Sequence, residues 1–257
     1  MIRTKIFQFT NFFPWVAGIL LFGFVIILLT SLTPDNKRYR NKTGNSYNPK
    51  STLYQDTTSI PLHKTLPPSG KLIKGKPVGK NWINLKASMN NWNMDQKYWK
   101  LEKGILHGEY PGGELHNYGW TKNTYKNFEL NVLIRMTGRE ANSGVCIRIQ
   151  PINADKAPGY QVDMGPGYWG CLWEEGRGGM IQSFPKELAK KVVKDKDWNH
   201  YYIIARGHHI QAWLNEVKTI DTIHAAGFES GAIGFQLCHG DKETIIDVSA
   251  LYLRDLH

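Results

Sequence analysis

From residue 81 onward the sequence consists of short segments rich in β-branched and aromatic residues, separated by clusters of Gly, Asn, Asp or Pro. These segments are FELNVLIRM (128–136), GVCIRIQ (144–150), GYQVDM (159–164), YWGCLW (168–173), WNHYYIIAR (198–206), HIQAWL (209–214), GAIGFQL (231–237) and TIIDVSALYL (244–253). Only PKELAKKVVKDKD (185–197) has a helical pattern, with Pro185 suited to a first turn. Many short strands and almost no helix predict an antiparallel β-sandwich or barrel, and residues 81–257 suffice for one substantial core.

The run FPWVAGILLFGFVIILLTSL (13–32) contains no charged residue. As a helix rising 1.5 Å per residue, it is long enough to cross a hydrocarbon core of about 30 Å. Phe12, Phe13 and Trp15 stand at one end, as interfacial aromatic residues do. We therefore expect a transmembrane signal-anchor after a short N-terminal basic segment (1–12). A cleaved signal peptide is the alternative, but the exit TSLTPDN lacks small residues at both cleavage-determining positions.

The positive charge of the chain lies before the β-rich part. Residues 1–80 contain 12 of the 32 Lys and Arg and two of the 22 Asp and Glu, so 12 − 2 = +10 is the whole formal net charge. Residues 33–80 are rich in Asn, Ser, Thr, Pro and Lys and lack Trp and Phe, which predicts a flexible basic linker. Because residues 81–257 are neutral overall, the composition does not favour binding to nucleic acid.

Cys146, Cys171 and Cys238 all lie in apolar, strand-like segments. An odd number of cysteines without Cys-x-x-Cys spacing argues against a disulfide framework and against a zinc ribbon, so we expect buried thiols that pack as small hydrophobic side chains. The chain contains no HExxH, P-loop or GxSxG motif, and no GxGxxG between a strand and a helix. Zinc peptidase, nucleotide-binding and serine hydrolase functions are therefore not favoured.

Alternation with a period of two sorts the side chains of three predicted strands. Their apolar faces consist of Val145, Ile147 and Ile149, of Tyr160, Val162 and Met164, and of Ile233, Phe235 and Leu237. Their opposite faces carry polar residues. If the strands are neighbours in one sheet, we expect Arg148, Gln161, Asp163, Gln236 and the following His239 on its outer face.

The stretch GYQVDMGPGYWGCLWEEGRGG (159–179) adds aromatic residues to this face. We expect Trp169 and Trp173 to border the outer face, with Glu175 at the strand end. Planar hydrogen-bonding groups beside indole rings suit a sugar, whose hydroxyls need donors and acceptors and whose apolar face stacks on aromatic rings. An ordinary solvated sheet face is the alternative, although such faces favour Lys, Glu and Thr.

Six motifs follow one another in this part of the chain. They are WKLEKGILHGEY (99–110), GGELHNYGWTKNTYKNFELNVLIRM (112–136), NSGVCIRIQ (142–150), GYQVDM (159–164), WNHYYIIARGHHIQAWLNEVKTID (198–221) and GAIGFQLCHG (231–240). The ordered set resembles the 3-keto-disaccharide hydrolase domain family over essentially all of 81–257. The resemblance implies a concanavalin-like (LamG-like) jelly-roll sandwich, in a bacterial exported or envelope protein that acts on oxidised glycosides.

The chemistry that the resemblance implies begins with a sugar whose C3 ketone acidifies the proton at C2. A carboxylate or His base removes that proton and expels the C1 substituent, while a second group protonates the departing oxygen and Arg holds the enolate oxygen. Addition of water then gives net hydrolysis. Asp163, Glu175, His239 and Arg148 supply these catalytic residue types, and Gln161, Trp169, Trp173, Gln236 and Arg177 are the expected substrate contacts.

One motif departs from the family pattern, because many members have Glu-x-Gln where this chain has Gln161-Val162-Asp163. A sub-group with Gln-x-Asp followed by Tyr-Trp-Gly-Cys-Leu resembles this chain. Catalytic roles therefore do not carry over residue by residue. Structural alternatives are an Arg148–Asp163 ion pair, an Asp163 cap on the turn at 165–167, Arg177 paired with whichever of Glu174 and Glu175 points away from the site, and a loop-packing His239.

Two further questions stay open from the sequence. No cofactor is required, but a divalent metal could sit where Asp163, Glu175 and His239 converge, and a loop could hold a structural calcium ion. Basic residues flank 13–32 on both sides, and the positive-inside rule taken alone leaves the C-terminal domain cytoplasmic. The resemblance instead implies the periplasmic or extracytoplasmic side, which is the location we expect.

The sequence thus supports three functional hypotheses. The first is a membrane-anchored glycoside-cleaving enzyme, a hydrolase or lyase acting on 3-keto-glycosides by acid/base chemistry. The second is a non-catalytic, membrane-tethered carbohydrate-binding module. The third is a structural envelope protein in which the polar face has no ligand.

Overall fold

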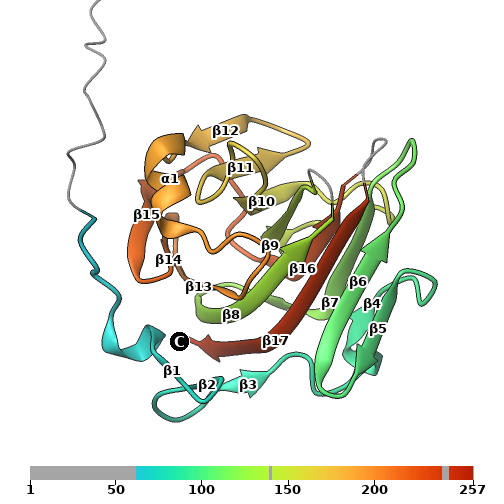
Figure 1. Cartoon of the computed structure of the whole chain (residues 1–257), viewed down its shortest axis with the longest axis horizontal. Coiled ribbons are helices and arrows are strands. Elements are labelled where there is room, and N and C mark those ends of the chain that lie inside the picture. Colours follow the sequence, from blue (N-terminus) through green and yellow to red (C-terminus); the bar gives the residue numbers. More distant parts are fainter. Residues whose placement is uncertain (1–61, 139–140, 239–242, 257) are drawn as a thin grey trace, which may run out of the picture. The chain divides into compact units, whose positions relative to one another are not determined.

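Two antiparallel β-sheets pack face to face in the computed structural model, which describes residues 62–138, 141–238 and 243–256 (Figure 1). The strand order is β12-β11-β10-β9-β16-β7-β4 in a seven-stranded sheet and β15-β14-β13-β8-β17-β6-β5 in an eight-stranded sheet. Half of the neighbours in these two orders are not consecutive in sequence, so the chain crosses repeatedly between the two layers. The fold is an all-β sandwich consistent with the expected jelly roll.

The strand bounds are as follows. The seven-stranded sheet contains β4 (Trp92–Asn93), β7 (Asn117–Tyr125), β9 (Ser143–Ile149), β10 (Gly159–Met164), β11 (Leu172–Glu175), β12 (Gly179–Gln182) and β16 (Gly231–Leu237). The eight-stranded sheet contains β5 (Trp99–Glu102), β6 (Ile105–Tyr110), β8 (Phe128–Thr137), β13 (Asn199–Arg206), β14 (His209–Leu214), β15 (Val217–Ile223) and β17 (Thr244–Asp255), and β3 (Ile83–Asn84) pairs with β17. A short hairpin joins β1 (Leu72–Ile73) to β2 (Lys76–Pro77).

The predicted strands lie within strands of the structure, with one exception. Residues 168–171 of the segment YWGCLW form turns, and β11 begins only at Leu172. The backbone N–H of Tyr168 donates to Gly165 O and that of Cys171 donates to Tyr168 O, while Gly170 adopts a φ of 78°. These consecutive turns use the backbone groups that a strand would have offered to a neighbour.

The predicted helix is shorter than the pattern 185–197. Helix α1 (Lys186–Val192) follows Pro185, as expected, and buries Leu188, Ala189 and Val192. Val193 then takes an extended conformation, and two described 3₁₀ turns, Pro68–Gly70 and Met89–Asn91, are the other helical segments.

The core lies between the sheets and contains the predicted apolar faces of β9, β10 and β16. It includes Val145 and Ile147, Tyr160, Val162 and Met164, and Ile233, Phe235 and Leu237. Ile149 is an exception, because it packs with Cys146 and Tyr118 on the outer face of the seven-stranded sheet. The period of two therefore breaks between Ile147 and Ile149.

Arg148 causes this break. Its φ is 52°, and the register between β9 and β16 shifts at the same place, so the strand carries a β-bulge. The guanidinium is fully buried and donates to the carbonyls of Lys126, Gly207 (2.6 Å) and Phe228 (3.5 Å). Our expectation that Arg148 shares the outer face with Gln161 is therefore wrong. Arg148 ties together three loops at one end of the sandwich, and it does not pair with Asp163.

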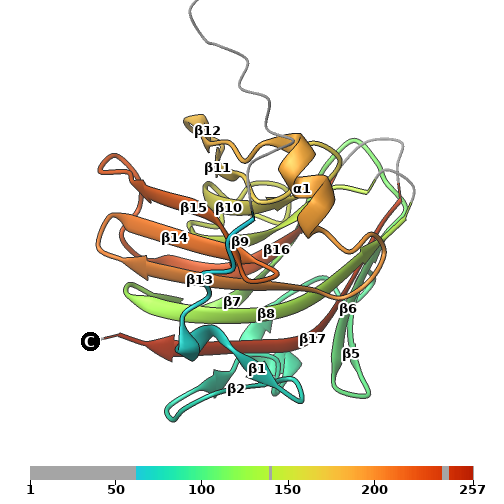
Figure 2. The same ribbon diagram turned by 60° about the vertical axis from the view of Figure 1, so that its left-hand side comes forward.

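Part of the predicted linker, which ends at residue 80, packs on the domain. Residues 62–75, which we call the N-terminal arm, cross the outer face of the eight-stranded sheet (Figure 2). Lys64 bridges to Val217, and Ser69 Oγ lies 2.8 Å from Tyr202 OH. Small and aliphatic residues of the arm fit against the sheet, with Gly70 in contact with the Tyr202 ring. Aliphatic burial thus orders a segment that has no Trp or Phe.

The anchor predicted at 13–32 lies outside the described residues. In the part of the chain that the structure describes, no helix is long and apolar enough to cross a membrane.

Candidate functional site

The outer face of the seven-stranded sheet carries two rows of facing residues. Strand register places Asp163, Gly144, Gln236 and Tyr118 in one row. It places Trp173, Gln161, Cys146, Gly234 and Trp120 in the next. Because directly paired residues of antiparallel strands project from the same face, polar groups gather in the middle of the sheet and an indole ring stands at each side.

Gln161 and Gln236 connect the two rows. Gln161 Nε2 donates to Gln236 Oε1 at 3.2 Å and to Asp163 Oδ1 at 3.4 Å, and its own Oε1 accepts from the Cys146 thiol at 3.3 Å. Gln236 Nε2 donates to Tyr118 OH at 2.6 Å. The sequence prediction that Gln161, Asp163 and Gln236 lie together is confirmed. We call these three residues, with Tyr118, Cys146 and Glu175, the polar cluster.

Asp163 is the most perturbed carboxyl group of the polar cluster. It is 5% exposed, and burial raises its pKa to about 7 despite the hydrogen bonds from the Met164 N–H (2.9 Å) and Gln161. Both of these donors reach Oδ1, and no described residue donates to Oδ2. One carboxyl oxygen is thus held by two donors, while the other receives no hydrogen bond from a described residue. The structural role that the sequence also allowed for Asp163, a cap on the turn at 165–167, would explain the hydrogen bond from the Met164 N–H but not the one from Gln161.

Glu175 lies opposite Gly159 at the end of β11 and therefore projects from the same face as Gln161. Burial raises its pKa, and its charge also raises the pKa values of Asp163, Tyr118 and Cys146. Two carboxyl groups in one poorly solvated region disfavour each other's ionisation. Burial is thus the main cause of the raised pKa at both groups, and the charge of Glu175 adds to it at Asp163.

Glu174, one residue earlier, faces Tyr160 on the core side and is buried. Its Oε2 accepts from the Gly178 N–H at 3.1 Å, and its Oε1 lies 3.5 Å from Arg177 Nε. Only one of the two adjacent glutamates therefore belongs to the polar cluster, and Arg177 pairs with the other.

Tyr118, a member of the polar cluster, and the adjacent His116 were not predicted by the sequence analysis. Burial holds the pKa of Tyr118 well above its usual value, so its hydroxyl stays protonated and can donate onward. His116 Nδ1 lies 3.3 Å from Gln236 Nε2. The His116 and Tyr118 rings meet edge to face, with their centroids 5.7 Å apart. The alternation of NYGWT (117–121) is a signal that could have placed Tyr118 and Trp120 on one face. His116 precedes the strand and belongs to no such pattern.

Besides Arg148, three expected site residues lie away from the polar cluster or outside the described residues. Trp169 packs on the main core, stacked on Tyr201 with ring centroids 6.3 Å apart. Arg177 lies over the Phe228 ring at 4.5 Å and donates to Ala226 O at 2.9 Å. His239 lies outside the described residues. Trp173, in contrast, stands beside Gln161 as expected.

The cysteines and possible metal ligands can be placed only within the described ranges. Cys146 and Cys171 are buried free thiols, and Cys238 is half-buried. Burial raises the pKa of Cys146, so this thiol is protonated and packs as a small side chain with a weak donor. No three His, Cys, Asp or Glu side chains of residues 62–138, 141–238 and 243–256 form a group able to hold a metal ion.

Gly144 leaves the space in which Gln161 lies, because a Cβ atom at residue 144 would stand 2.2 Å from Gln161 Cγ. We predict that Gly144→Ala displaces Gln161 and lowers the free energy of unfolding by about 1–3 kcal/mol, measured by denaturant titration. In the double variant Gly144→Ala/Gln161→Ala the clash disappears, so the cost should be clearly less than the sum of the two single changes. Additive costs would contradict this explanation.

Comparison with models of protein families gives a match over residues 80–249 to a 3-keto-disaccharide hydrolase model, described as a 3-keto-alpha-glucoside-1,2-lyase-like domain. The matched region includes the whole polar cluster. None of the curated proteins with which the sequence was compared matches it.

Several solved structures are similar to this chain. A proposed glycosyl hydrolase from Parabacteroides distasonis aligns with a TM-score of 0.51 and 23% identity, over 69% of this chain and 100% of that one. A second from the same organism has a TM-score of 0.49 and 16% identity, over 69% and 94%. A carbohydrate-binding module from Bacillus subtilis has 0.48 and 12%, over 68% and 96%. The first alignment shows a shared fold.

Proposed function

The chain belongs to the 3-keto-alpha-glucoside-1,2-lyase-like domain family, and from this membership we propose that the polar cluster cleaves a glycoside whose sugar carries a ketone at C3. The observation that supports the proposal most is the buried Asp163, whose pKa is raised to about 7 beside a second carboxyl group. A group that exchanges its proton near neutral pH is suited to general acid–base catalysis.

In the proposed reaction the ionised Asp163 removes the proton at C2, and its Oδ2 is the oxygen available for this step. The C2 electrons form the enolate with the C3 carbonyl, and the C1–O bond then breaks as the enolate collapses. The departing oxygen leaves with the bonding pair and takes a proton from Glu175, whose pKa is raised by burial. Water added to the resulting unsaturated ketone gives the hydrolysis product.

The enolate oxygen needs donors, and Arg148 is not available for this role because its guanidinium is bonded to loop carbonyls. We assign the role to the Tyr118 hydroxyl, because both N–H groups of the Gln161 amide are already bonded to Gln236 and Asp163. Tyr118 accepts from Gln236 Nε2 and keeps its own proton for a ligand. Neutral donors held in a buried network stabilise developing negative charge without reorganisation.

The experiment that tests this proposal incubates the full chain with 3-keto glycosides and with their unoxidised parents. We expect chromatography to show release of the C1 substituent from the keto compounds only, because a hydroxyl at C3 does not acidify the C2 proton. No release from any 3-keto glycoside would overturn the proposal.

A non-catalytic carbohydrate-binding function is the second candidate, and the half-buried Trp173 beside Gln161 favours it. We predict that Trp173→Ala weakens binding of a glycan about tenfold, measured by calorimetry, because stacking on an indole ring is lost. Trp198→Ala, at a half-buried Trp that contacts Arg135, is the matched control and should bind as wild type does. Binding of unoxidised glycans with no cleavage of any substrate would select this function.

Membrane attachment through residues 13–32 and an extracytoplasmic location belong to the same proposal. The apolar run and the family resemblance support them. Carbonate extraction of membranes, followed by protease treatment of intact spheroplasts, tests both, and release of the full chain by carbonate would contradict the anchor.

A further inference from the structure

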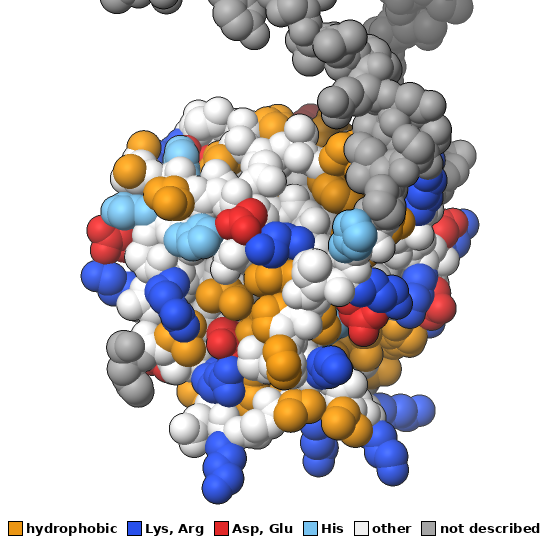
Figure 3. Space-filling model, turned by 90° about the vertical axis from the view of Figure 1, so that its left-hand side faces the viewer, with side chains coloured by type: hydrophobic (Ala, Val, Ile, Leu, Met, Phe, Trp, Pro, Cys, Tyr) orange, Lys and Arg blue, Asp and Glu red, His pale blue; other side chains and the backbone are white. Residues whose placement is uncertain are grey.

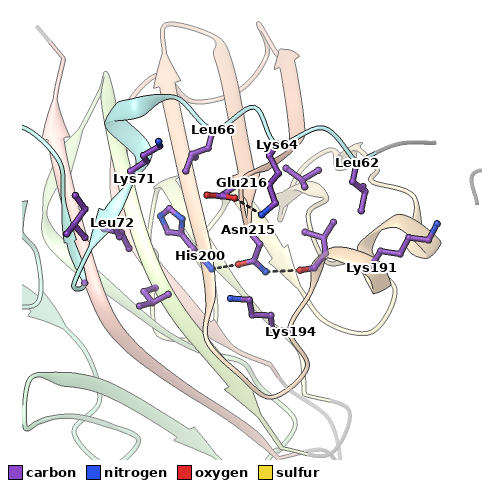
Figure 4. Close-up of a pocket in the computed structure, with 15 residues that line it drawn as sticks. Leu62, Lys64, Leu66, Lys71, Leu72, Lys191, Lys194, His200, Asn215 and Glu216 are labelled. Carbon is purple, nitrogen blue, oxygen red and sulfur yellow. Dashed lines mark hydrogen bonds and ion pairs between the residues drawn. The ribbon is translucent and has the colours of Figure 1, made fainter. Parts of the chain in front are cut away.

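A large cavity lies on the opposite side of the sandwich from the polar cluster. It has a volume of about 720 Å³. The N-terminal arm forms one wall, and the outer face of the eight-stranded sheet forms the floor through Leu133, His200 and Val217 (Figure 4). Cavities of about 300–1,000 Å³ accommodate small organic ligands.

The apolar part of this cavity is aliphatic. Leu62, Leu66 and Leu72 of the arm face Leu133 and Val217 of the sheet, and no Trp, Tyr or Phe lines the cavity. Figure 3 shows this side of the domain, where hydrophobic side chains lie between lysines. A sugar would find no ring on which to stack here, whereas a hydrocarbon chain would find continuous aliphatic surface.

The charged part of the cavity is positive. Lys64, Lys71, Lys191 and Lys194 line it, with Glu216 as its one acidic residue. Lys64 Nζ lies 2.8 Å from Glu216 Oε2, and this hydrogen bond lowers the pKa of Glu216. No described carboxylate pairs with Lys71 or Lys194. The cavity therefore has a net positive charge that its own acid does not cancel.

The uncharged polar groups of the cavity do not compensate for this charge. His200 Nε2 lies 2.8 Å from Asn131 Oδ1, and burial lowers the pKa of His200 to about 4, so its ring is neutral at pH 7. The Asn215 side-chain amide donates to Val192 O at 2.9 Å and to Asn199 Oδ1 at 2.8 Å. Its oxygen accepts from the backbone N–H of His200. These groups are engaged within the protein, which leaves the lysines to recognise a ligand.

We propose that this cavity binds an amphipathic anion, a single hydrocarbon chain that carries a phosphate head. The chain packs between the arm and the sheet, and the head lies between Lys71 and Lys194. Lysine recognises phosphate as a compact charge with several donors, and burial of the methylene groups adds affinity in proportion to their area. A phospholipid headgroup with its acyl chain and a soluble phosphate monoester share this chemistry.

The experiment measures the melting temperature of the full chain, held in zwitterionic nanodiscs, as octyl phosphate is added below its micellar concentration. A ligand that binds only the folded domain raises this temperature. We expect saturable stabilisation in the wild type, and an apparent affinity at least tenfold weaker in Lys71→Gln/Lys194→Gln. Leu133→Trp, which fills the floor, should weaken binding similarly, while Lys100→Gln on the distant strand β5 should leave it unchanged.

Two further ligands separate the contributions of head and chain. Inorganic phosphate should stabilise the domain much less than octyl phosphate, and the neutral octyl glucoside should not show the dependence on Lys71 and Lys194. Octyl phosphate added in solution, compared with a long-chain phosphate lipid incorporated in the nanodisc, distinguishes a soluble from a membrane source. Equal effects of octyl phosphate in all variants, equal effects of inorganic phosphate, or no effect in the wild type would overturn the proposal.

Discussion

Asp163→Asn is expected to lower kcat for a 3-keto glycoside by about 10²–10⁴-fold, because the amide cannot accept the C2 proton. The substitution keeps the size of the side chain and an oxygen able to accept the Met164 N–H. Substrate affinity should therefore change little. Single-turnover kinetics with separate titration of binding measures the two effects. Asp255→Asn, an exposed carboxylate at the end of β17, is the control and should retain full turnover.

The same variant should be more stable than the wild type above neutral pH. The folded state holds a proton on Asp163 up to a pKa of about 7, whereas an unfolded Asp loses it near its ordinary pKa of 3.8. Between these values the native state binds more protons, so the free energy of unfolding falls as pH rises through this range. The raised pKa of Glu175 acts in the same direction.

The size of this stability effect follows from the shift. The two pKa values of Asp163 differ by about three, which corresponds to at most roughly 4 kcal/mol in the free energy of unfolding. At pH 8 the melting temperature of Asp163→Asn should therefore be up to about 10 °C higher than that of the wild type. At pH 4 the wild type and the variant should differ little. Thermal unfolding monitored at both pH values checks this, and a less stable variant at pH 8 would show that the ionised carboxylate is a stabilising group.

Arg148→Met should destabilise the domain by about 3–5 kcal/mol. Met replaces Arg with an apolar side chain of similar length, and it leaves the carbonyls of Lys126, Gly207 and Phe228 without their donor. Each buried unsatisfied group costs about 1–3 kcal/mol. Denaturant unfolding of the two proteins gives the difference. Met also has to adopt the positive φ at this bulge, as Arg148 does, so backbone strain is matched between them.

Arg206→Met provides a control for Arg148→Met, because Arg206 is an exposed arginine at the end of β13. It should change the free energy of unfolding by less than about 0.5 kcal/mol. A loss below 1 kcal/mol in Arg148→Met would mean that the three loops hold their positions without the guanidinium. Loss of turnover with unchanged stability would instead restore Arg148 to the reacting groups.

Alternation of apolar and polar residues predicted much of the candidate site. It placed Gln161 and Asp163 on one face of β10 and Gln236 on the same side of β16, and the structure brings the three together. This succeeded because one buried face fixes the register of a strand. Arg148 escaped the same reasoning, since a residue with positive φ inserts a bulge that no period of two contains.

Residues in turns and before strands were harder to place. Trp169 stands in a series of turns, so its direction depends on contacts with Tyr201 that are distant in sequence. His116 reaches Gln236 from a loop that Asp155 holds through the His116 N–H. The arm was missed because composition counts aromatic residues and charges, whereas its order comes from a few aliphatic side chains that match one groove.

The N-terminal arm also fixes where the rest of the protein is attached. Residue 62 lies against the outer side of the eight-stranded sheet, and the polar cluster lies on the outer side of the other sheet. Whatever precedes residue 62 is thus connected on the side of the eight-stranded sheet, opposite the polar cluster. The attachment at residue 62 and the polar cluster are therefore separated by both layers of the sandwich, so a substitution in the arm can alter the attachment without touching the polar cluster.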